Sequence, residues 1–442
     1  MQHFKILLFL FFLVFATPAN AEINLIRDAE IEELLRDYSS PIFEAAGIPS
    51  TSVRLFIIND DSLNAYVAGG MNMFIHTGLL TRAKTPEMVI GVMAHETGHI
   101  EGGHVIRRAQ EAEGLGLQNI LSTALGAAVT VAGLPQAGTA IIMGGAHISG
   151  RQFASYSREQ EVAADQAAIR YLSSTQQSAR GLLDVMQNLR RDSVLDYDAI
   201  DQYAQSHPLT SQRISQLRSY LQSQPKFGES KFSERHKRMV AKLEGFLNRP
   251  EFVLGKYTDN SISSRYARAV AYYRDGKAER SYAELDAMLA VEQENPFFNE
   301  LKGQILGENE NTIEAEKYYA LADKYHPNNA LLLNELGNFQ LANGKTQAGI
   351  NTLEKSATLE PENSTTWHLL VTTYGRLANE PYLRYNLAQE ANSLGKTDEA
   401  ITYAEEAKKL FKERSAEWLA MNDLLNELKL RKEKEDDEGD LF

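Results

Sequence analysis

The feature that most constrains the fold of this chain is a sequence repeat in its second half. Small residues, aromatic residues and a closing proline recur with a period of about 34 residues, beginning near residue 256. The two clearest copies contain Gly303, Ala315, Tyr319, Ala322 and Pro327, then Gly337, Gly349, Leu353, Ser356 and Pro361. This period predicts pairs of helices that stack on their neighbours into a curved α-solenoid with a concave binding face.

A third copy of the repeat supports the same fold. Residues around Gly276 form a degenerate first copy, and the small residues of the last copy are Ala388, Gly395, Ala400, Ala404 and Ala407. The period and the placing of these residues resemble the tetratricopeptide repeat (TPR). We therefore expect an all-α TPR solenoid over residues 256–430, followed by a solvated charged tail over residues 431–442.

The first half contains a short motif with the spacing of a metal site, His95-Glu96-Thr97-Gly98-His99. The run before it predicts a helix, because Thr85 is a good N-cap, Pro86 fits the first helical position and apolar residues recur at helical spacing. Two histidines four apart share one helical face and can bind one metal ion together. Glu96 is then placed to deprotonate a metal-bound water.

A third metal ligand is expected at Glu161. The metzincin spacing for a third histidine falls on a valine and misses His104 by one residue. Glu161 and Asp165 lie one helical turn apart, so one carboxylate can bind the metal while the other orients a ligand histidine. His95, His99 and Glu161 would then hold one Zn²⁺ per chain and leave a fourth position for water, the gluzincin arrangement.

Between residues 55 and 215 the chain contains several short motifs whose order and spacing together are characteristic. They are Asn64-Ala65-Tyr66-Val67-Ala68-Gly69-Gly70, Thr77-Gly78-Leu79-Leu80, Ala94-His95-Glu96-Thr97-Gly98-His99, Ser157-Arg158-x-x-Glu161-x-x-Ala164-Asp165 and His207-Pro208-x-x-x-x-Arg213-Ile214. This set resembles the peptidase family that contains HtpX and the CAAX prenyl proteases, and within it the periplasmic BepA-type members that end in a TPR domain. The resemblance implies an α+β gluzincin-type metallopeptidase domain. It also implies misassembled outer-membrane β-barrel proteins as substrates, and contact with their assembly machinery.

His207 and Arg213 are candidate site residues downstream of the metal ligands. Pro208 restricts His207 to extended geometry, at the end of a loop that enters a helix. There His207 could act catalytically as a donor to the oxyanion, occupy the fourth metal position and hold the enzyme off, or simply pack and cap locally. Arg213 is expected to pair with a buried carboxylate, either Asp165 or Glu159.

A strand-like region runs from residue 65 to residue 76 and is interrupted by two glycines, which suggests a bulge or a tight turn. We expect its second part to pair with an extended substrate as an added strand. The residues of this predicted substrate edge are Met71, Asn72, Met73 and Phe74. Such pairing reads backbone more than side chains and suits the cleavage of unfolded chains.

Residues 114–150 contain no Asp, Glu, Lys or Arg and are rich in small and aliphatic residues. One interpretation is a buried helical hairpin over the active-site helices. A second is a mobile lid whose apolar face makes peripheral contact with lipid or with unfolded substrate. A transmembrane hairpin is the third, which the shortness of each half disfavours.

The N-terminus has the pattern of a cleaved signal peptide over residues 1–21. Lys5 is followed by an apolar run to Phe15, and Ala19-Asn20-Ala21 is a small-residue cleavage site. The alternative, a single N-terminal anchor, is disfavoured because the run is short. The chain has no cysteine, which excludes a lipoprotein anchor and disulfides, so we expect a periplasmic protein.

Charge and domain order complete the prediction. The chain carries 45 Lys+Arg against 59 Asp+Glu, a formal charge of -14, which argues against nucleic acid as a partner. We expect a zinc metallopeptidase domain over residues 22–221, a helical connector over 222–255 and then the solenoid. The predicted function is zinc-dependent endopeptidase action on unfolded or misassembled proteins. The alternatives are a TPR chaperone or adaptor with latent, gated protease activity, and a membrane-integral peptidase that uses residues 114–150.

Overall fold

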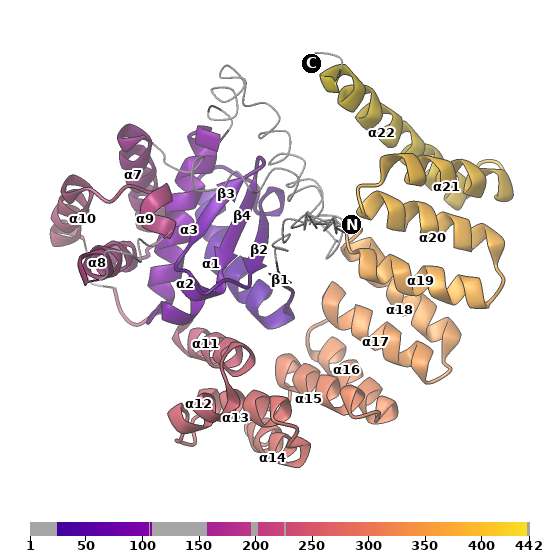
Figure 1. Cartoon of the computed structure of the whole chain (residues 1–442), viewed down its shortest axis with the longest axis horizontal. Helices are drawn as coiled ribbons and strands as arrows, with labels where there is room; N and C mark the ends of the chain where they lie inside the picture. Colours follow the sequence, from indigo (N-terminus) through magenta and orange to yellow (C-terminus); the bar gives the residue numbers. More distant parts are fainter. Residues whose placement is uncertain (1–23, 106, 108–156, 196–201, 225–226, 440–442) are drawn as a thin grey trace, which may run out of the picture.

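The computed structural model describes residues 24–105, 107, 157–195, 202–224 and 227–439 (Figure 1). A small mixed sheet with its helices forms the N-terminal part, and a continuous array of helices forms the rest. The expected fold class, an α+β peptidase domain followed by an all-α TPR solenoid, is confirmed. The predicted signal peptide and the apolar stretch 114–150 lie outside the described residues. Among the described helices, none has both the length and the apolar character needed to cross a bilayer.

The sheet has four strands in the order β1-β2-β4-β3. Their bounds are Leu25–Ile26 for β1, Arg54–Ile58 for β2, Ala65–Ala68 for β3 and Asn72–His76 for β4. Strands β2 and β4 run parallel, and the other two pairs are antiparallel. The interruption between β3 and β4 is a tight turn at Gly69 and Gly70, whose φ angles of 54° and 88° favour glycine.

The prediction that Met71 to Phe74 form a substrate edge is wrong. Strand β4 lies inside the sheet, and its Phe74 is paired with Phe56 of β2 on one side and Tyr66 of β3 on the other. Backbone groups on both sides of β4 are therefore committed to the sheet, and no substrate strand can add there. Alternation of side chains predicts the two faces of a strand but not its neighbours. Among the described strands, β3 is the outer one on this side.

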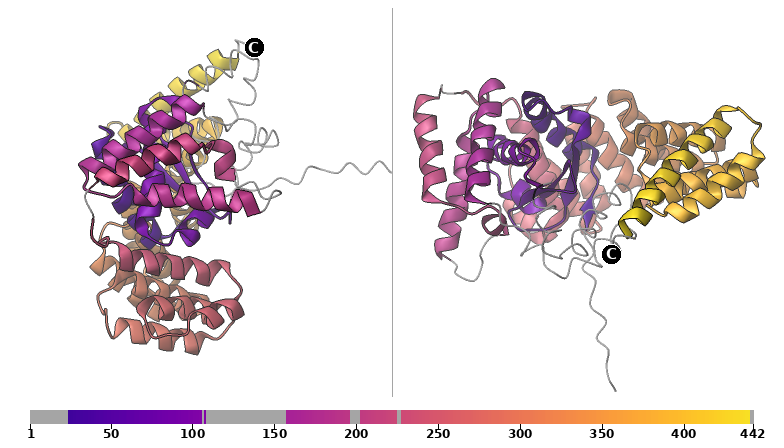
Figure 2. Two further views of the ribbon diagram at one scale, coloured as in Figure 1. Left: turned by 90° about the vertical axis from the view of Figure 1, so that its left-hand side faces the viewer. Right: turned by 90° about the horizontal axis from the view of Figure 1, so that it is seen from above.

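Helices pack on the sheet and on one another around a single core. They are α1 (Ala29–Ala45), α2 (Thr77–Arg82), α3 (Pro86–Glu101), α7 (Arg158–Ser174), α8 (Arg180–Leu195), α9 (Gln202–Ser206) and α10 (Ser211–Ser223), with a 3₁₀ turn at Ser50–Ser52. Helix α3 is buried from Met88 to His99, as expected of a helix that is apolar on nearly every side. Helices α7, α8 and α10 lie on the side of the sheet away from the helical array (Figures 1 and 2).

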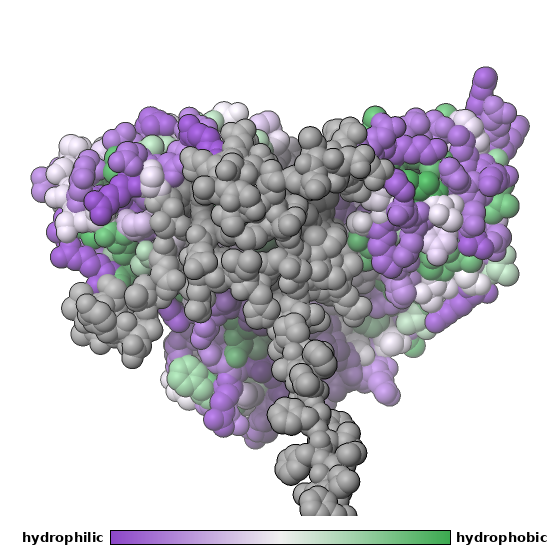
Figure 3. All heavy atoms as spheres, turned by 45° about the horizontal axis from the view of Figure 1, so that its top comes forward, coloured by the Kyte–Doolittle hydropathy of each residue, from purple (hydrophilic) through white to green (hydrophobic). Residues whose placement is uncertain are grey.

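The helical array begins with α11 (Ser233–Leu247) and α12 (Pro250–Lys256). The helices that follow are α13 (Ile262–Arg274), α14 (Ala278–Leu289), α15 (Pro296–Glu308), α16 (Thr312–Tyr325), α17 (Ala330–Ala342), α18 (Thr346–Leu359), α19 (Ser364–Arg376), α20 (Glu380–Ser393), α21 (Thr397–Leu410) and α22 (Ala416–Gly439). The repeated glycines permit close helix pairing, because a Cβ on Gly303 would lie 2.8 Å from the Tyr319 ring. On the face of the array that Figure 3 shows, the surface is mostly hydrophilic, with hydrophobic residues in small separate groups.

The charged tail is helical over most of its length. Helix α22 continues through residue 431 to Gly439, and the expected solvation of this stretch stays a prediction. Arg431 pairs with Glu427 one turn earlier at 2.8 Å, and Lys432 pairs with Asp398 of α21. Opposite charges one helical turn apart support a helix in this stretch.

The first turn of α1 joins the peptidase part to the helical array. Lys242 of α11 is buried, and its Nζ lies 2.7 Å from Asp28 Oδ2 and 3.4 Å from Glu30 Oε2. The Tyr266 hydroxyl of α13 donates to Glu30 at 2.7 Å. Ala29 packs in an apolar cluster with Phe297, Ala322 and Leu332 of the array.

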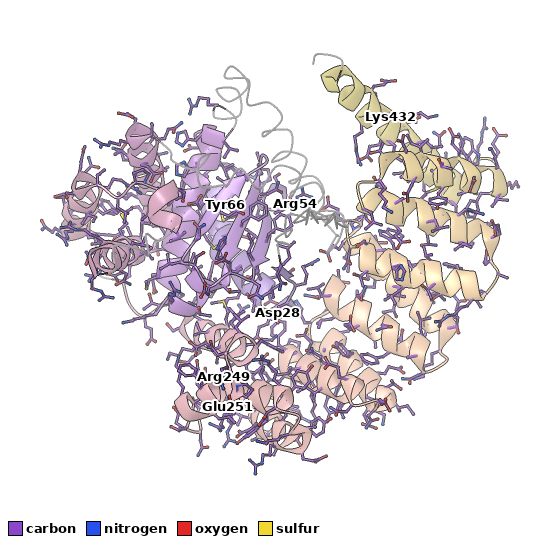
Figure 4. All side chains as sticks on the ribbon, in the orientation of Figure 1. Asp28, Arg54, Tyr66, Arg249, Glu251 and Lys432 are labelled. Carbon is purple, nitrogen blue, oxygen red and sulfur yellow. The ribbon has the colours of Figure 1, made fainter. Side chains whose placement is uncertain are left out.

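Two ion pairs extend this joint. Arg27 reaches Glu360 at 2.6 Å, and Arg54 of β2 reaches Glu362 at 2.7 Å. Figure 4 shows Asp28 and Arg54 on the border of the peptidase part that faces the array. Helix α11, which lies in the predicted connector, contributes Met239 to the same core as the peptidase helices. The two parts are therefore held by polar and apolar contacts along one surface.

Candidate metal centre

Helix α3 supplies three residues of the predicted site. His95, Glu96 and His99 are all fully buried, and the Nε2 atoms of the two histidines lie 3.1 Å apart. Pro86 stands in the first turn of the helix, as its fixed φ favours. The spacing of the two histidines thus brings both rings to one point, as the sequence predicts.

Helix α7 brings Glu161 to the same point. Its Oε2 lies 3.5 Å from His95 Nε2, and its Oε1 lies 3.3 Å from His99 Nε2. A capping box fixes the start of α7, because the Ser157 side chain accepts from the Gln160 amide and the Gln160 side chain accepts from the Ser157 amide. Glu161 stands in the first turn after this cap, so the cap sets the position of its carboxylate.

His207 completes the cluster from the loop between α9 and α10. Its Nδ1 lies 2.9 Å from Glu161 Oε1 and 3.3 Å from His95 Nε2, and its Nε2 lies 3.4 Å from Glu96 Oε1. Tyr203 of α9 stacks on the His207 ring with centroids 4.4 Å apart. The ligand atoms of His95, His99, Glu161 and His207 all lie within 4.8 Å of one another, which is close enough for one metal ion.

Asp165 and Arg213 hold this cluster from behind. Asp165 Oδ1 lies 2.9 Å from His95 Nδ1, the ring nitrogen that faces away from the cluster. Arg213 donates to Asp165 from Nε and Nη2, at 2.6 and 2.9 Å, and its Nη1 pairs with Glu161. Of the two partners that the sequence left open for Arg213, the structure shows Asp165, while Glu159 is exposed.

One contact at the site was not predicted. His104 Nδ1 lies 2.9 Å from His99 Nδ1, and His104 is buried. In the sequence this histidine only fails the spacing of a third ligand. The chain turns back at Gly103, whose φ is 61°, and this reversal brings His104 onto His99. Helical periodicity does not predict such a reversal of the chain. The adjacent glycines Gly102 and Gly103 indicate only where a reversal can occur.

Burial and neighbouring charges shift the pKa values of the site in opposite directions. Burial raises the pKa of the Glu96 carboxyl, and His207 acts against that rise. Burial would also raise the pKa of Glu161, but His207 and His95 together lower it well below its usual range. Burial lowers the pKa of His95, but Glu161 and Asp165 outweigh it and raise the pKa to about 9. Burial lowers the pKa of His99 well below its usual range, which keeps this ring in the neutral form that binds a metal ion.

The donor set fits a metal ion. Two histidine nitrogens and one carboxylate form the protein ligands of many catalytic zinc sites. Both Glu96 oxygens are buried and have no hydrogen-bond partner among the described residues. A buried carboxylate without a partner is costly, and at a functional site it indicates a missing water or ion.

Comparison with known proteins agrees with this geometry. Residues 26–221 match the model of Peptidase family M48, and residues 381–413 match a tetratricopeptide-repeat model. The beta-barrel assembly-enhancing protease of Escherichia coli (strain K12) is 24% identical over 389 residues, which cover 86% of this chain and 79% of that protein. The protein of the same name from Yersinia pestis is 23% identical over 393 residues, covering 86% and 80%.

Motif, metal-binding geometry and comparison lead to one conclusion. The HExxH helix, the carboxylate on the second helix and the match to the family model all fall within the same 26–221 segment. The repeats behind it are those that the 34-residue period predicts. The chain is a metalloprotease in which residues 26–221 match peptidase family M48 and are followed by a TPR solenoid.

Proposed function

We propose that this protein is a zinc-dependent endopeptidase of the periplasm that acts on unfolded or misassembled proteins. The observation that carries the proposal is the buried carboxylate of Glu96, which makes no hydrogen bond among the described residues, beside a four-residue donor cluster. His95, His99 and Glu161 are the proposed Zn²⁺ ligands. When bound there, zinc would polarise the scissile carbonyl as a Lewis acid and make water easier to deprotonate.

The chain's own residues would handle the protons. Glu96 lies beside the cluster and its oxygens make no hydrogen bond among the described residues, so its carboxylate would take a proton from the attacking water and pass it to the leaving amine. Burial raises the pKa of this carboxyl, which makes it a stronger base than an exposed glutamate. Asp165 would hold His95 in one ring orientation, and Arg213 would hold Asp165.

The proposed substrates are misassembled outer-membrane β-barrel proteins. The name of the relatives, beta-barrel assembly-enhancing protease, supports this class, as does the match over most of both chains. Strand β3, the outer strand beside α3, is the proposed edge for pairing with an extended substrate. The TPR solenoid is the proposed docking domain for substrate or for the barrel-assembly machinery. The periplasmic location rests on the expected signal peptide.

A second function, a TPR chaperone or adaptor with latent and gated protease activity, is favoured by the closure of the site. His95, Glu96, His99, Glu161 and His207 are all fully buried. A ring nitrogen of His207 also lies close enough to the other three residues that it would serve as a fourth ligand of the same ion. A peptide can reach these buried residues only if the parts of the protein that cover them are displaced.

Zinc content and casein cleavage by the wild type and by Glu96→Gln test the two functions. The proposed endopeptidase binds one zinc per chain in both proteins but cleaves casein only as the wild type. General-base loss typically lowers the rate about 10²–10⁴-fold. Wild-type protein that binds zinc and unfolded barrel protein but cleaves neither substrate would favour the chaperone. Wild-type protein without zinc would contradict the site itself.

A further inference from the structure

The two histidines of α3 are held from behind by different kinds of partner. His95 Nδ1 faces the Asp165 carboxylate at 2.9 Å, whereas His99 Nδ1 faces the neutral ring of His104, also at 2.9 Å. The Nε2 atoms of both histidines point into the cluster, where they lie 3.1 Å apart. Each proposed ligand therefore has one nitrogen for the metal and one nitrogen for a holding partner.

The backbone is shaped to bring His104 to this position. Gly103 has φ 61° and turns the chain back at the end of α3. Gly102 leaves room for the ring, because a Cβ there would lie 2.6 Å from His104 Nε2. A side chain at Gly102 would have to displace the His104 ring, so the two glycines are needed for the His99–His104 contact.

The proton positions follow from the geometry. A nitrogen that offers a lone pair to a metal carries no proton, so a metal-bound His99 has its proton on Nδ1. That proton is donated to His104 Nδ1, which must then be the acceptor and carry the His104 proton on Nε2. One imidazole thus fixes both the tautomer and the ring angle of the other.

Charge explains why a neutral partner suits His99. Glu96, Glu161 and Asp165 bring three negative charges to the described site, and Arg213 brings one positive charge. A divalent ion would balance the remainder. A carboxylate behind His99 would add a fourth buried negative charge to the site, and such a charge is expensive to bury. The His104 ring gives an acceptor without that charge.

We propose that His104 is a positioning residue of the metal centre, which accepts the Nδ1 proton of His99 and holds its ring toward the metal. The inference deepens the proposed zinc site and rests on it. Partners of metal-bound histidines typically change metal affinity by about 10–100-fold when they are removed. His104 is expected to act through affinity and geometry, without touching substrate.

Three substitutions test the role. His104→Asn keeps an acceptor oxygen near the position of Nδ1. His104→Gln places its amide near Nε2, and His104→Leu has no acceptor. The affinity for Zn²⁺ is measured by competition with a chelator, and the coordination geometry by the absorption spectrum of the Co²⁺-loaded protein. Thermal melting of the metal-free proteins checks their folding.

The expected result is that H104L and H104Q bind Zn²⁺ about 10–100-fold more weakly and shift the Co²⁺ spectrum, while H104N remains close to the wild type. If H104L does not fold, H104N against H104Q carries the comparison. If H104L and H104Q keep the Zn²⁺ affinity and the Co²⁺ spectrum of the wild type, the inference about His104 is wrong and the zinc site remains. The same holds if H104N binds Zn²⁺ as weakly as H104Q does. A wild type that binds no Zn²⁺ would overturn both.

Discussion

At the scale of single residues, the site depends on a buried arginine. Arg213 is 1% exposed and pairs with Asp165 and Glu161, so it neutralises carboxylates that would otherwise repel each other. Burial alone would raise the pKa of Asp165, but the Arg213 hydrogen bonds outweigh it and lower that pKa. Asp165 therefore stays ionised and can hold His95. One cation thus supports both the ligand carboxylate and the carboxylate behind a ligand histidine.

Removing this cation should destabilise the whole domain. Arg213→Met leaves two buried carboxylates without their partner, and breaking a buried ion pair typically costs about 3–5 kcal/mol. Denaturant unfolding of the metal-free protein measures the loss. Arg170→Met is the matched control, because Arg170 pairs with Glu101 on the surface and such pairs contribute at most about 1 kcal/mol. Equal losses in the two variants would mean that Arg213 is not the support of the site.

His207 gives a second prediction at this scale. Its ring contacts Glu96, Glu161 and His95 in a closed site, so we expect it to block rather than to assist. His207→Ala should therefore raise basal casein cleavage and produce self-cleavage products visible on a gel. A fall of about 10²-fold would instead assign His207 to the oxyanion, on the scale of one lost donor. Adding the Glu96→Gln change must abolish any gain, which controls for a contaminating protease.

At the scale of elements, the site depends on how closely α3 and α7 approach. Gly98 lies between the two ligand histidines, and a Cβ there would lie 2.9 Å from the Cα and the carbonyl oxygen of Ala164. These contacts are backbone, so they cannot move without moving α7. Glu161 stands on that helix one turn before Ala164, and its distance from the two histidines is set by the same crossing.

Gly98→Ala should therefore weaken metal binding more than it weakens the fold. The added methyl group pushes α7 outward and carries Glu161 away from His95 and His99, where small misplacements matter. Chelator competition measures the affinity, and circular dichroism measures the fold. Gly375→Ala is the control, because a Cβ there meets only the Leu383 side chain at 3.9 Å. Unchanged affinity in Gly98→Ala would show that α7 can shift without loss.

The sequence predicts these elements better than it predicts their neighbours. The helical spacings of His95 with His99 and of Glu161 with Asp165 suffice to place these residues on two helices, and the repeat period suffices for the solenoid. The strand order could not be predicted from the sequence. Side chains that alternate with a period of two define the two faces of a strand, but they do not show that β4 lies between β2 and β3. The His104 contact did not follow either, since it depends on one backbone reversal at Gly103.

At the scale of the whole molecule, residues 27–30 connect the two halves through buried charge. Asp28 and Glu30 of the peptidase part, Lys242 of α11 and Glu300 of α15 meet at one point, with Glu335 of α17 nearby. Tyr266 of α13 donates to Glu30, and Arg238 of α11 also acts on that carboxyl. The three carboxyl groups of Asp28, Glu30 and Glu300 surround the single ammonium group of Lys242, which cannot balance all three when they are ionised.

This excess makes the joint sensitive to pH. Burial raises the pKa of the Glu300 carboxyl to about 8; Lys242 opposes the rise, and Asp28 and Glu30 add to it. The ordinary value is 4.5, so the folded protein holds this proton more tightly than the unfolded chain. The stabilising contribution of that proton is complete below the ordinary value and is lost as pH rises through about 8. The contact between the two halves should therefore weaken as the medium becomes alkaline.

Glu300→Gln isolates this effect. The amide resembles the protonated carboxyl and cannot ionise, so the variant should keep the stability that the wild type loses as pH rises from about 5 to about 9. Melting temperatures of both proteins, measured across that range without metal, give the comparison. The curves should agree near pH 5 and separate progressively above it, with the wild type lower. Because the metal centre is unchanged between the two proteins, its own titration cancels in the difference. Parallel curves would mean that Glu300 keeps an ordinary pKa and that the joint between peptidase and solenoid does not respond to pH through this residue.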